Sequence, residues 1–204
     1  LFSYMEALAA TYEDYIATVG EIDFNTYFKN NIYHVPFSGI SFRAHKLLMG
    51  MSADVTIEEV NASFKTKVSP SITYAKHIGA TYGGSIFLAL LGTIDTVADL
   101  KAGDRMGIFS YGSGSCAEYY SMLITNKSKE VAKQAGIQAL LDKRYSITVA
   151  QYEAMEADRE RRIKDADFEP NYNMVPGLYD AAYKGKDLLI YKGSKGYYRT
   201  YGFS

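Results

Sequence analysis

The sequence predicts a single α/β domain in which helices outnumber strands. Several segments repeat apolar residues every three to four positions, which is the period of a helix. Two short aromatic and β-branched segments are separated by glycines, which is typical of adjacent strands. No repeat, low-complexity tract or linker divides residues 1–204. The 204 residues, 48% of them hydrophobic, are enough to enclose a sizeable core.

Helices are expected first along the chain. Four segments have helical periodicity: residues 1–20, 38–51, 56–68 and 70–79. Pro36 interrupts the chain before the second segment, and Ser38 is a suitable N-cap for it. Pro70 occupies the first turn of the fourth segment, where its missing N–H is tolerated. His34 is therefore expected in a loop that leads into a helix.

Strands are expected only later in the chain. Residues 80–100 begin with a glycine pair and then turn apolar on nearly every side, which predicts a buried helix. The predicted strands and the elements that follow them are a strand pair at 104–114 and 115–125, helices at 128–145 and 148–164, and a closing hairpin at 187–202. The second of these helices is heavily charged and is expected to face solvent.

Composition excludes several classes of function. The 23 acidic residues nearly cancel the 22 basic ones, so no broad positive field exists to bind nucleic acid. One cysteine cannot form an internal disulfide, and the three histidines are scattered, so we expect a cytoplasmic protein without a metal site. The longest apolar run, residues 85–94, is about half of the roughly 20 residues that a membrane span needs. No membrane association is expected.

Cys116 follows a glycine-serine loop, which raises the question of whether it is a nucleophile. A reactive thiolate needs a helix N-terminus or a nearby cation, whereas Cys116 is expected within a strand among apolar neighbours. It is therefore predicted to be a small core residue. The loop lacks the lysine of a phosphate-binding motif and leads into a strand, so it is predicted to be a turn. Its backbone N–H groups and Ser113 remain candidates to line a pocket.

Three other side chains are candidates for a site. His34 precedes Pro36 and a helix start, so its imidazole can be held rigidly and donate to a developing oxyanion. A structural histidine is the alternative, and the residues alone favour it. Arg43 and Lys46 are three residues apart on one helix, where they can share a face that binds a phosphate. For these two cations, simple solvation is the alternative.

Four segments in this order carry a family resemblance: YHVPFSGISFRAH (33–45), IGATYGGSIFLALLGTID (78–95), GDRMGIFSYGSGSCAEYYS (103–121) and YYRTYG (197–202). Together they resemble the C-terminal half of 3-hydroxy-3-methylglutaryl-CoA (HMG-CoA) synthases, which are thiolase-like condensing enzymes. The resemblance implies a layered α-β-α-β-α fold of which residues 1–204 supply the C-terminal half. It also implies that the N-terminal half of the same enzyme is a partner and that the enzyme is a homodimer.

The resemblance further implies an acyltransferase. In the family, an acetyl group is loaded onto a cysteine, a glutamate removes a methyl proton, and the resulting enolate attacks the ketone of a β-ketoacyl thioester. That cysteine and glutamate lie upstream of this chain, and Cys116 does not match them. His34 matches the histidine that binds and polarises the acceptor. Tyr111 and Ser113 match a loop that lines the active-site floor, and Tyr82 is a further substrate contact. No cofactor is implied, because phosphopantetheine carries the substrates.

Two departures from the family pattern indicate the subtype. Ala80 replaces an asparagine that contacts substrate in the family. Gly39 occupies the first of several cationic positions in synthases of primary metabolism, so less charge is available for the phosphates of coenzyme A. Arg43 and Lys46 suit the single phosphodiester of an acyl carrier protein. The sequence therefore resembles polyketide β-branching synthases. The alternatives are a primary-metabolism synthase using acetyl-CoA and acetoacetyl-CoA, and a non-catalytic half that binds carrier proteins.

Overall fold

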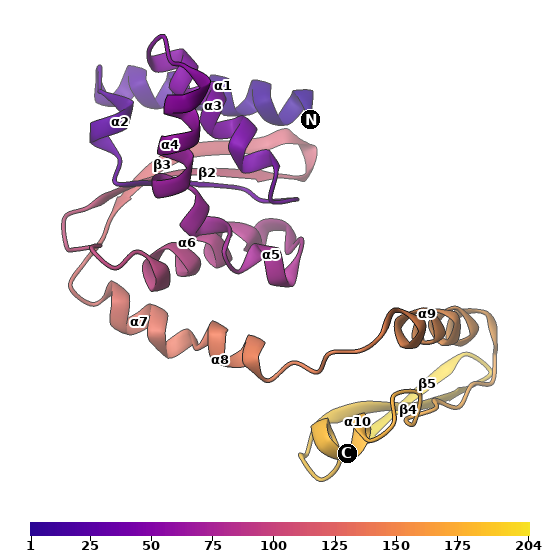
Figure 1. The fold of residues 1–204 in the computed structure, drawn as a ribbon. Helices are drawn as coiled ribbons and strands as arrows, with labels where there is room; N and C mark the ends of the chain where they lie inside the picture. Colours follow the sequence, from indigo (N-terminus) through magenta and orange to yellow (C-terminus); the bar gives the residue numbers. More distant parts are fainter. The chain divides into compact units, whose positions relative to one another are not determined.

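The computed structural model describes residues 1–112 and 114–204 (Figure 1). By their internal contacts, these residues form two compact units, Leu1–Asp142 and Lys143–Ser204. The assignment of the whole chain to one domain stays a prediction. The α/β class is evident in the first unit, where a sheet is packed between helices.

The first unit contains most of the regular structure. Its helices are α1 (Phe2–Val19), α2 (Phe24–Tyr27), α3 (Ile40–Ser52), α4 (Ile57–Lys67), α5 (Ala75–Ile78), α6 (Ser85–Thr96), α7 (Ser128–Ala135) and α8 (Ile137–Asp142). Its strands are β1 (Asn30–Tyr33), β2 (Arg105–Gly112) and β3 (Cys116–Leu123). Short 3-10 turns at Ser69–Ile72 and Tyr82–Gly84 complete the connections. The two predicted strands are confirmed as β2 and β3, whereas β1 was not predicted.

The sheet has the order β1-β2-β3. β1 is parallel to β2, with Tyr33 opposite Phe109, and β3 is antiparallel to β2, with Gly112 opposite Cys116. The turn between β2 and β3 contains Gly114 at a φ of 78°, a conformation that glycine adopts without a steric penalty. The glycine-serine loop is thus a hairpin turn, as predicted.

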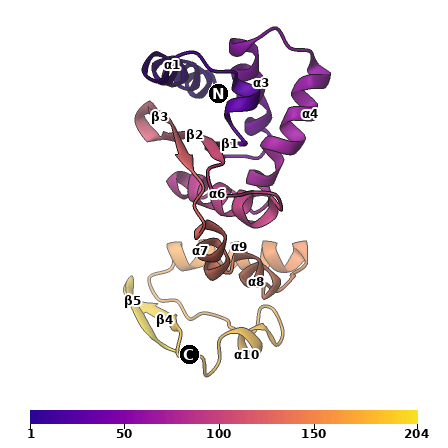
Figure 2. The same cartoon turned by 90° about the vertical axis from the view of Figure 1, so that its left-hand side faces the viewer.

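Side chains alternate between the two faces of this sheet. Tyr33, Phe109 and Tyr119 face a cluster that includes buried residues of α1, α3 and α4. Ile32 and Ile108 face a second cluster that is built on α6. Figures 1 and 2 show α1 and α3 on one side of the strands and α6 on the other. This three-layer arrangement places the carboxyl end of β1 between α1 and α6.

Several sequence expectations about helices need correction. The helix predicted at 70–79 is divided into the 3-10 turn at Ser69–Ile72 and α5. α3 begins after Gly39 without a side-chain cap, because the Ile40 N–H donates to the carbonyl of Phe37 and replaces the predicted Ser38 cap. α6 is buried along one face only, since Phe87 is 67% exposed. By contrast, α4 begins at a capping box in which Thr56 and Glu59 satisfy each other's backbone N–H groups.

The second unit consists of α9 (Val149–Lys164), α10 (Leu178–Ala182), β4 (Leu189–Lys195) and β5 (Tyr198–Phe203). β4 and β5 form the predicted antiparallel hairpin. α9 has no buried residue and carries several ion pairs in its C-terminal half, as expected for a solvent-facing helix. In the first unit, the helix predicted at 128–145 is instead divided into α7 and α8 at Gly136, whose φ is 59°. In the described residues, we find no helix with the length and apolar composition needed to cross a bilayer.

His45 is a structural histidine in the core of the first unit. Its Nδ1 lies 3.0 Å from the Tyr33 hydroxyl, and its Nε2 lies 2.9 Å from Ser63 Oγ. The side chain has no exposed surface, and burial lowers its pKa to about 4. Both ring nitrogens are satisfied by hydroxyl groups, which can donate or accept, so the neutral ring fits the site.

Acid is expected to destabilise the protein through His45. Unfolding restores a pKa near 6.5, so the unfolded state binds a proton more tightly than the folded state does. The contribution to stability is therefore complete above about pH 6.5 and is lost as the pH falls toward 4, by about 3 kcal/mol in total. Urea unfolding at several pH values measures this loss. His45→Gln should flatten the pH dependence, and an unchanged slope in this variant would contradict the assignment.

Candidate active site

His34 follows β1 and is held by three hydrogen bonds. Its backbone N–H donates to the carbonyl of Phe109 at 2.9 Å, and its carbonyl accepts from the Tyr4 hydroxyl at 2.8 Å. Its Nδ1 lies 2.8 Å from Ser85 Oγ. The residue is 7% exposed. Among the described residues, Nε2 has no hydrogen-bond partner, so it is the ring nitrogen available to a substrate.

Burial determines the charge state at this position. Desolvation lowers the pKa of His34 and raises that of Tyr4 well above its ordinary value. The imidazole is therefore neutral and the phenol protonated near pH 7. A neutral imidazole can still donate a hydrogen bond from one nitrogen while the other accepts.

Tyr111 lies beside His34. The centroids of the two rings are 6.0 Å apart, and the Tyr111 ring is 5.2 Å from that of Tyr4. The Tyr111 hydroxyl is 3.2 Å from Ser115 Oγ, within the hairpin turn. The tertiary structure thus brings the loop at residues 34–37 (HVPF) to the glycine-serine loop at residues 109–114 (FSYGSG), although more than 70 residues separate them in the sequence.

The other loop candidates differ in position. Ser113 lies outside the described residues. Tyr82 is 85% exposed, and its φ of 50° is an uncommon conformation for a tyrosine. The turn that contains it contacts β2 and leads directly into Ser85. Among the described residues, no hydrogen bond or ring contact joins the Tyr82 side chain to His34. Its role as a substrate contact stays a prediction.

Arg43 and Lys46 are both exposed on α3. They line one groove of about 760 Å³, together with apolar side chains of α1 and α3 that include Phe2 and Met5. The expected shared cationic face is therefore present. An apolar groove with two cations suits an extended arm that carries a phosphate at one end and a thiol at the other.

The prediction that Cys116 is a core residue is wrong. Cys116 begins β3, as expected, but it is exposed. It pairs with Gly112 next to the hairpin turn, and its side chain lies on the face opposite Ala117, outside the cluster built on α6. The described residues contain no group of three His, Cys, Asp or Glu side chains suited to hold a metal ion.

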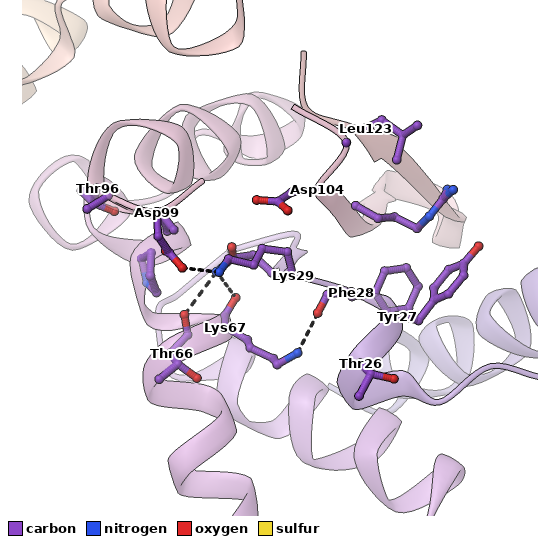
Figure 3. Close-up of a pocket in the computed structure, with 16 residues that line it drawn as sticks. Thr26, Tyr27, Phe28, Lys29, Thr66, Lys67, Thr96, Asp99, Asp104 and Leu123 are labelled. Atoms are coloured by element: carbon purple, nitrogen blue, oxygen red, sulfur yellow. Dashed lines mark hydrogen bonds and ion pairs between the residues drawn. The ribbon is translucent and has the colours of Figure 1, made fainter. Parts of the chain in front are cut away.

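A second pocket, of about 930 Å³, lies at the opposite ends of β1 and β2 (Figure 3). It contains three cations, but each has a protein partner. Lys29 forms an ion pair with Asp99, and Lys67 donates to backbone carbonyls. Arg105 lies 4.9 Å from the centroid of the Tyr27 ring. These contacts give the cations a structural role, so we place the candidate active site at His34.

Two residues of the site were missed in the sequence. Tyr4 is one helical turn before Leu8 on the buried stripe of α1, and its hydroxyl holds the His34 carbonyl. Ser85 follows a glycine pair at the start of α6. Local pattern marks both positions as parts of helices. Only the packing of α1 and α6 against β1 shows that they meet His34.

Comparison with known proteins identifies the family. Residues 41–184 match the family model described as hydroxymethylglutaryl-coenzyme A synthase C terminal. The polyketide biosynthesis 3-hydroxy-3-methylglutaryl-ACP synthase PksG of Bacillus subtilis is 30% identical over 98% of this chain and 48% of its own length. The hydroxymethylglutaryl-CoA synthase of Enterococcus faecalis is 30% identical over 76% of this chain and 39% of its own.

Solved structures agree with this result. The crystal structure of the curacin biosynthetic pathway HMG synthase in complex with holo donor-ACP is 31% identical, with a TM-score of 0.85, over 100% of this chain and 49% of that one. The thiolase-like fold expected from the resemblance is thereby confirmed. This chain spans about half the length of the relatives it matches. It belongs to the hydroxymethylglutaryl-coenzyme A synthase family and corresponds to the C-terminal half.

Proposed function

We propose that this chain is the acceptor-binding half of a carrier-protein-dependent HMG synthase. The enzyme condenses an acetyl group with the β-ketone of a β-ketoacyl thioester in polyketide β-branching. The observation that carries the proposal is His34, a rigidly held neutral imidazole with an open Nε2, whose ring lies beside that of Tyr111. A donor in this position stabilises the negative charge that develops on the ketone oxygen as the new carbon–carbon bond forms.

The nucleophilic cysteine and the glutamate base come from the N-terminal half in this proposal. Exposed large apolar side chains support such a partner, because monomers rarely expose contiguous apolar surface. Several of them are in the first unit: Leu1, Phe2, Phe37, Tyr82 and Phe87. The intact mass of the purified protein is a direct measurement of this point. A longer polypeptide or a co-purifying chain with a cysteine supports the enzyme, whereas the 204-residue chain alone favours a non-catalytic binding half.

The donor is proposed to be acetyl-carrier protein rather than acetyl-CoA. Gly39 and the two exposed cations Arg43 and Lys46 offer less positive charge than the several phosphates of coenzyme A require. The similarity to PksG and to a synthase solved with a donor carrier protein supports the same subtype. Steady-state kinetics with both donors test it. A higher kcat/KM with acetyl-carrier protein is expected, and equal turnover with acetyl-CoA favours the primary-metabolism alternative.

Reversing charge on α3 tests the surface on which the carrier docks. The double variant Arg43→Glu, Lys46→Glu should raise KM for carrier-bound substrates by about tenfold or more, because the introduced carboxylates repel the phosphodiester of the carrier's arm. The kcat should change little, since neither residue lies at His34. Lys65→Glu on α4 is a matched control, because it also reverses an exposed cation. An equal rise in KM for this control would show a general charge effect and contradict the assignment.

A further inference from the structure

We infer that Ser85 is the positioning residue that determines which ring nitrogen of His34 carries the proton. Its hydroxyl donates to Nδ1 and leaves the hydrogen on Nε2. The inference rests on the proposed function, because it specifies how the same histidine presents a donor to the ketone oxygen of the acceptor.

The contact between the two side chains is short and shielded from water. Ser85 Oγ lies 2.8 Å from His34 Nδ1 and 3.1 Å from the backbone nitrogen of Val35. Ser85 is 2% exposed and His34 7%. In such a site, a hydrogen atom without an acceptor carries the full cost of its desolvation.

Counting hydrogen atoms assigns the direction of the bond. A serine hydroxyl has one hydrogen and two acceptor lone pairs. The Val35 N–H can only donate, so it takes one lone pair of Ser85 Oγ. If Nδ1 also donated to Oγ, the serine hydrogen would have no acceptor among the described residues. If Ser85 donates to Nδ1 instead, the hydrogens of Val35 N and Ser85 Oγ both have acceptors, and the imidazole hydrogen lies on Nε2, which is not among the buried atoms without a partner and is therefore open to water or substrate.

The bond from Ser85 to Nδ1 determines the protonation state of the open nitrogen, Nε2. A neutral imidazole that accepts at Nδ1 carries its hydrogen on Nε2. A ketone oxygen has only lone pairs, so this tautomer can bind it and the other cannot. Ser85 is also the first residue of α6, and the positive end of the helix dipole disfavours a second proton at Nδ1. The ring is therefore held as a neutral donor.

The tautomer can be measured without substrate. The complete protein contains His34, His45 and His77 in this part of its chain, so ¹⁵N-labelled histidine gives few ring systems, which single substitutions assign. Multiple-bond ¹H–¹⁵N correlation spectra distinguish a protonated ring nitrogen from an unprotonated one. We expect His34 with its hydrogen on Nε2. A hydrogen on Nδ1 in the unmodified protein overturns the inference.

Variants connect the tautomer to turnover. Ser85→Ala should give His34 mixed tautomer signals and lower kcat by about tenfold, the loss that corresponds to one neutral hydrogen bond, with little change in KM. Ser85→Thr keeps the hydroxyl and should restore both the single tautomer and most of the kcat. The matched control is Ser71→Ala, a buried serine whose hydroxyl donates to the carbonyl of Val68 and not to a histidine.

These readouts separate the two proposals. An unchanged kcat in Ser85→Ala, or an equal loss in Ser71→Ala, contradicts the positioning role while condensation itself remains intact. If the His34 tautomer is as expected but the complete enzyme does not condense the two thioesters, the proposed function fails and the hydrogen-bond assignment stands.

Discussion

Replacing His34 with alanine in the complete enzyme is expected to lower kcat for condensation by about 10²- to 10⁴-fold, the range for loss of a positioned acid or base group. In the proposed reaction, the imidazole supplies the donor that meets the charge developing on the ketone oxygen. Tyr111 is the nearest aromatic neighbour, but its hydroxyl is paired with Ser115 in the turn. The measurement is steady-state turnover of acetyl and β-ketoacyl thioesters on their carriers.

The step that His34 serves can be separated from the step before it. In the proposed reaction, loading of the acetyl group onto the cysteine of the N-terminal half precedes attack on the ketone, so the His34→Ala protein should still form the acetyl-enzyme, visible as a mass increase. His77→Ala is the matched control, because His77 is an exposed histidine of the same unit. Condensation at the normal rate in His34→Ala would remove the role assigned to this residue.

Replacing Phe109 with alanine is expected to destabilise the protein by about 3–5 kcal/mol, as for other fully buried aromatic residues. Phe109 has no exposed surface and lies on β2, the central strand of the sheet. Its ring meets that of Tyr4 edge to face at a centroid distance of 5.1 Å. The substitution therefore leaves a cavity at the point where α1 packs on the sheet. Urea unfolding measures the loss.

The matched control for this substitution is on the same unit. Val131 on α7 is 60% exposed and is not among the side chains assigned to the interface with the N-terminal half, so Val131→Ala should change stability by less than about 0.5 kcal/mol. Similar losses in both variants would show that Phe109 does not occupy a close-packed core. The Phe109→Ala protein should also lose activity when folded, because the Tyr4 ring that it supports holds the His34 carbonyl.

Strand β1 is an element that the sequence pattern did not predict. Asn30 and Asn31 are polar, and all four residues of β1 are buried, so the segment lacks the alternation that identifies a half-exposed strand. Its pairing with β2 joins Asn30 to Met106, far along the chain. The strand exists because both faces of the sheet are covered by helices. That covering is not visible in any local window of the sequence.

The prediction that Cys116 is buried failed for a related reason. The neighbours of Cys116 placed it correctly on a strand, but burial depends on which face of the strand the side chain occupies and on whether that face is covered at that position. Tyr119 is buried on the face that packs on α1, whereas Cys116 lies on the opposite face, outside the cluster built on α6, and is exposed. Identity of an element and depth within the fold are separate properties, and the sequence pattern reports mainly the first.

By itself, the sequence determined the helical and strand periods, the hairpin turn, and two loops specific enough to predict the family. These properties depend on residues close together in the chain. Only the tertiary structure decided what surrounds His34: Tyr4, Ser85 and Phe109 reach it from 30, 51 and 75 positions away. The reason is physical, because partners at such separations are selected by the packing of helices on the sheet and not by the propensity of any single segment.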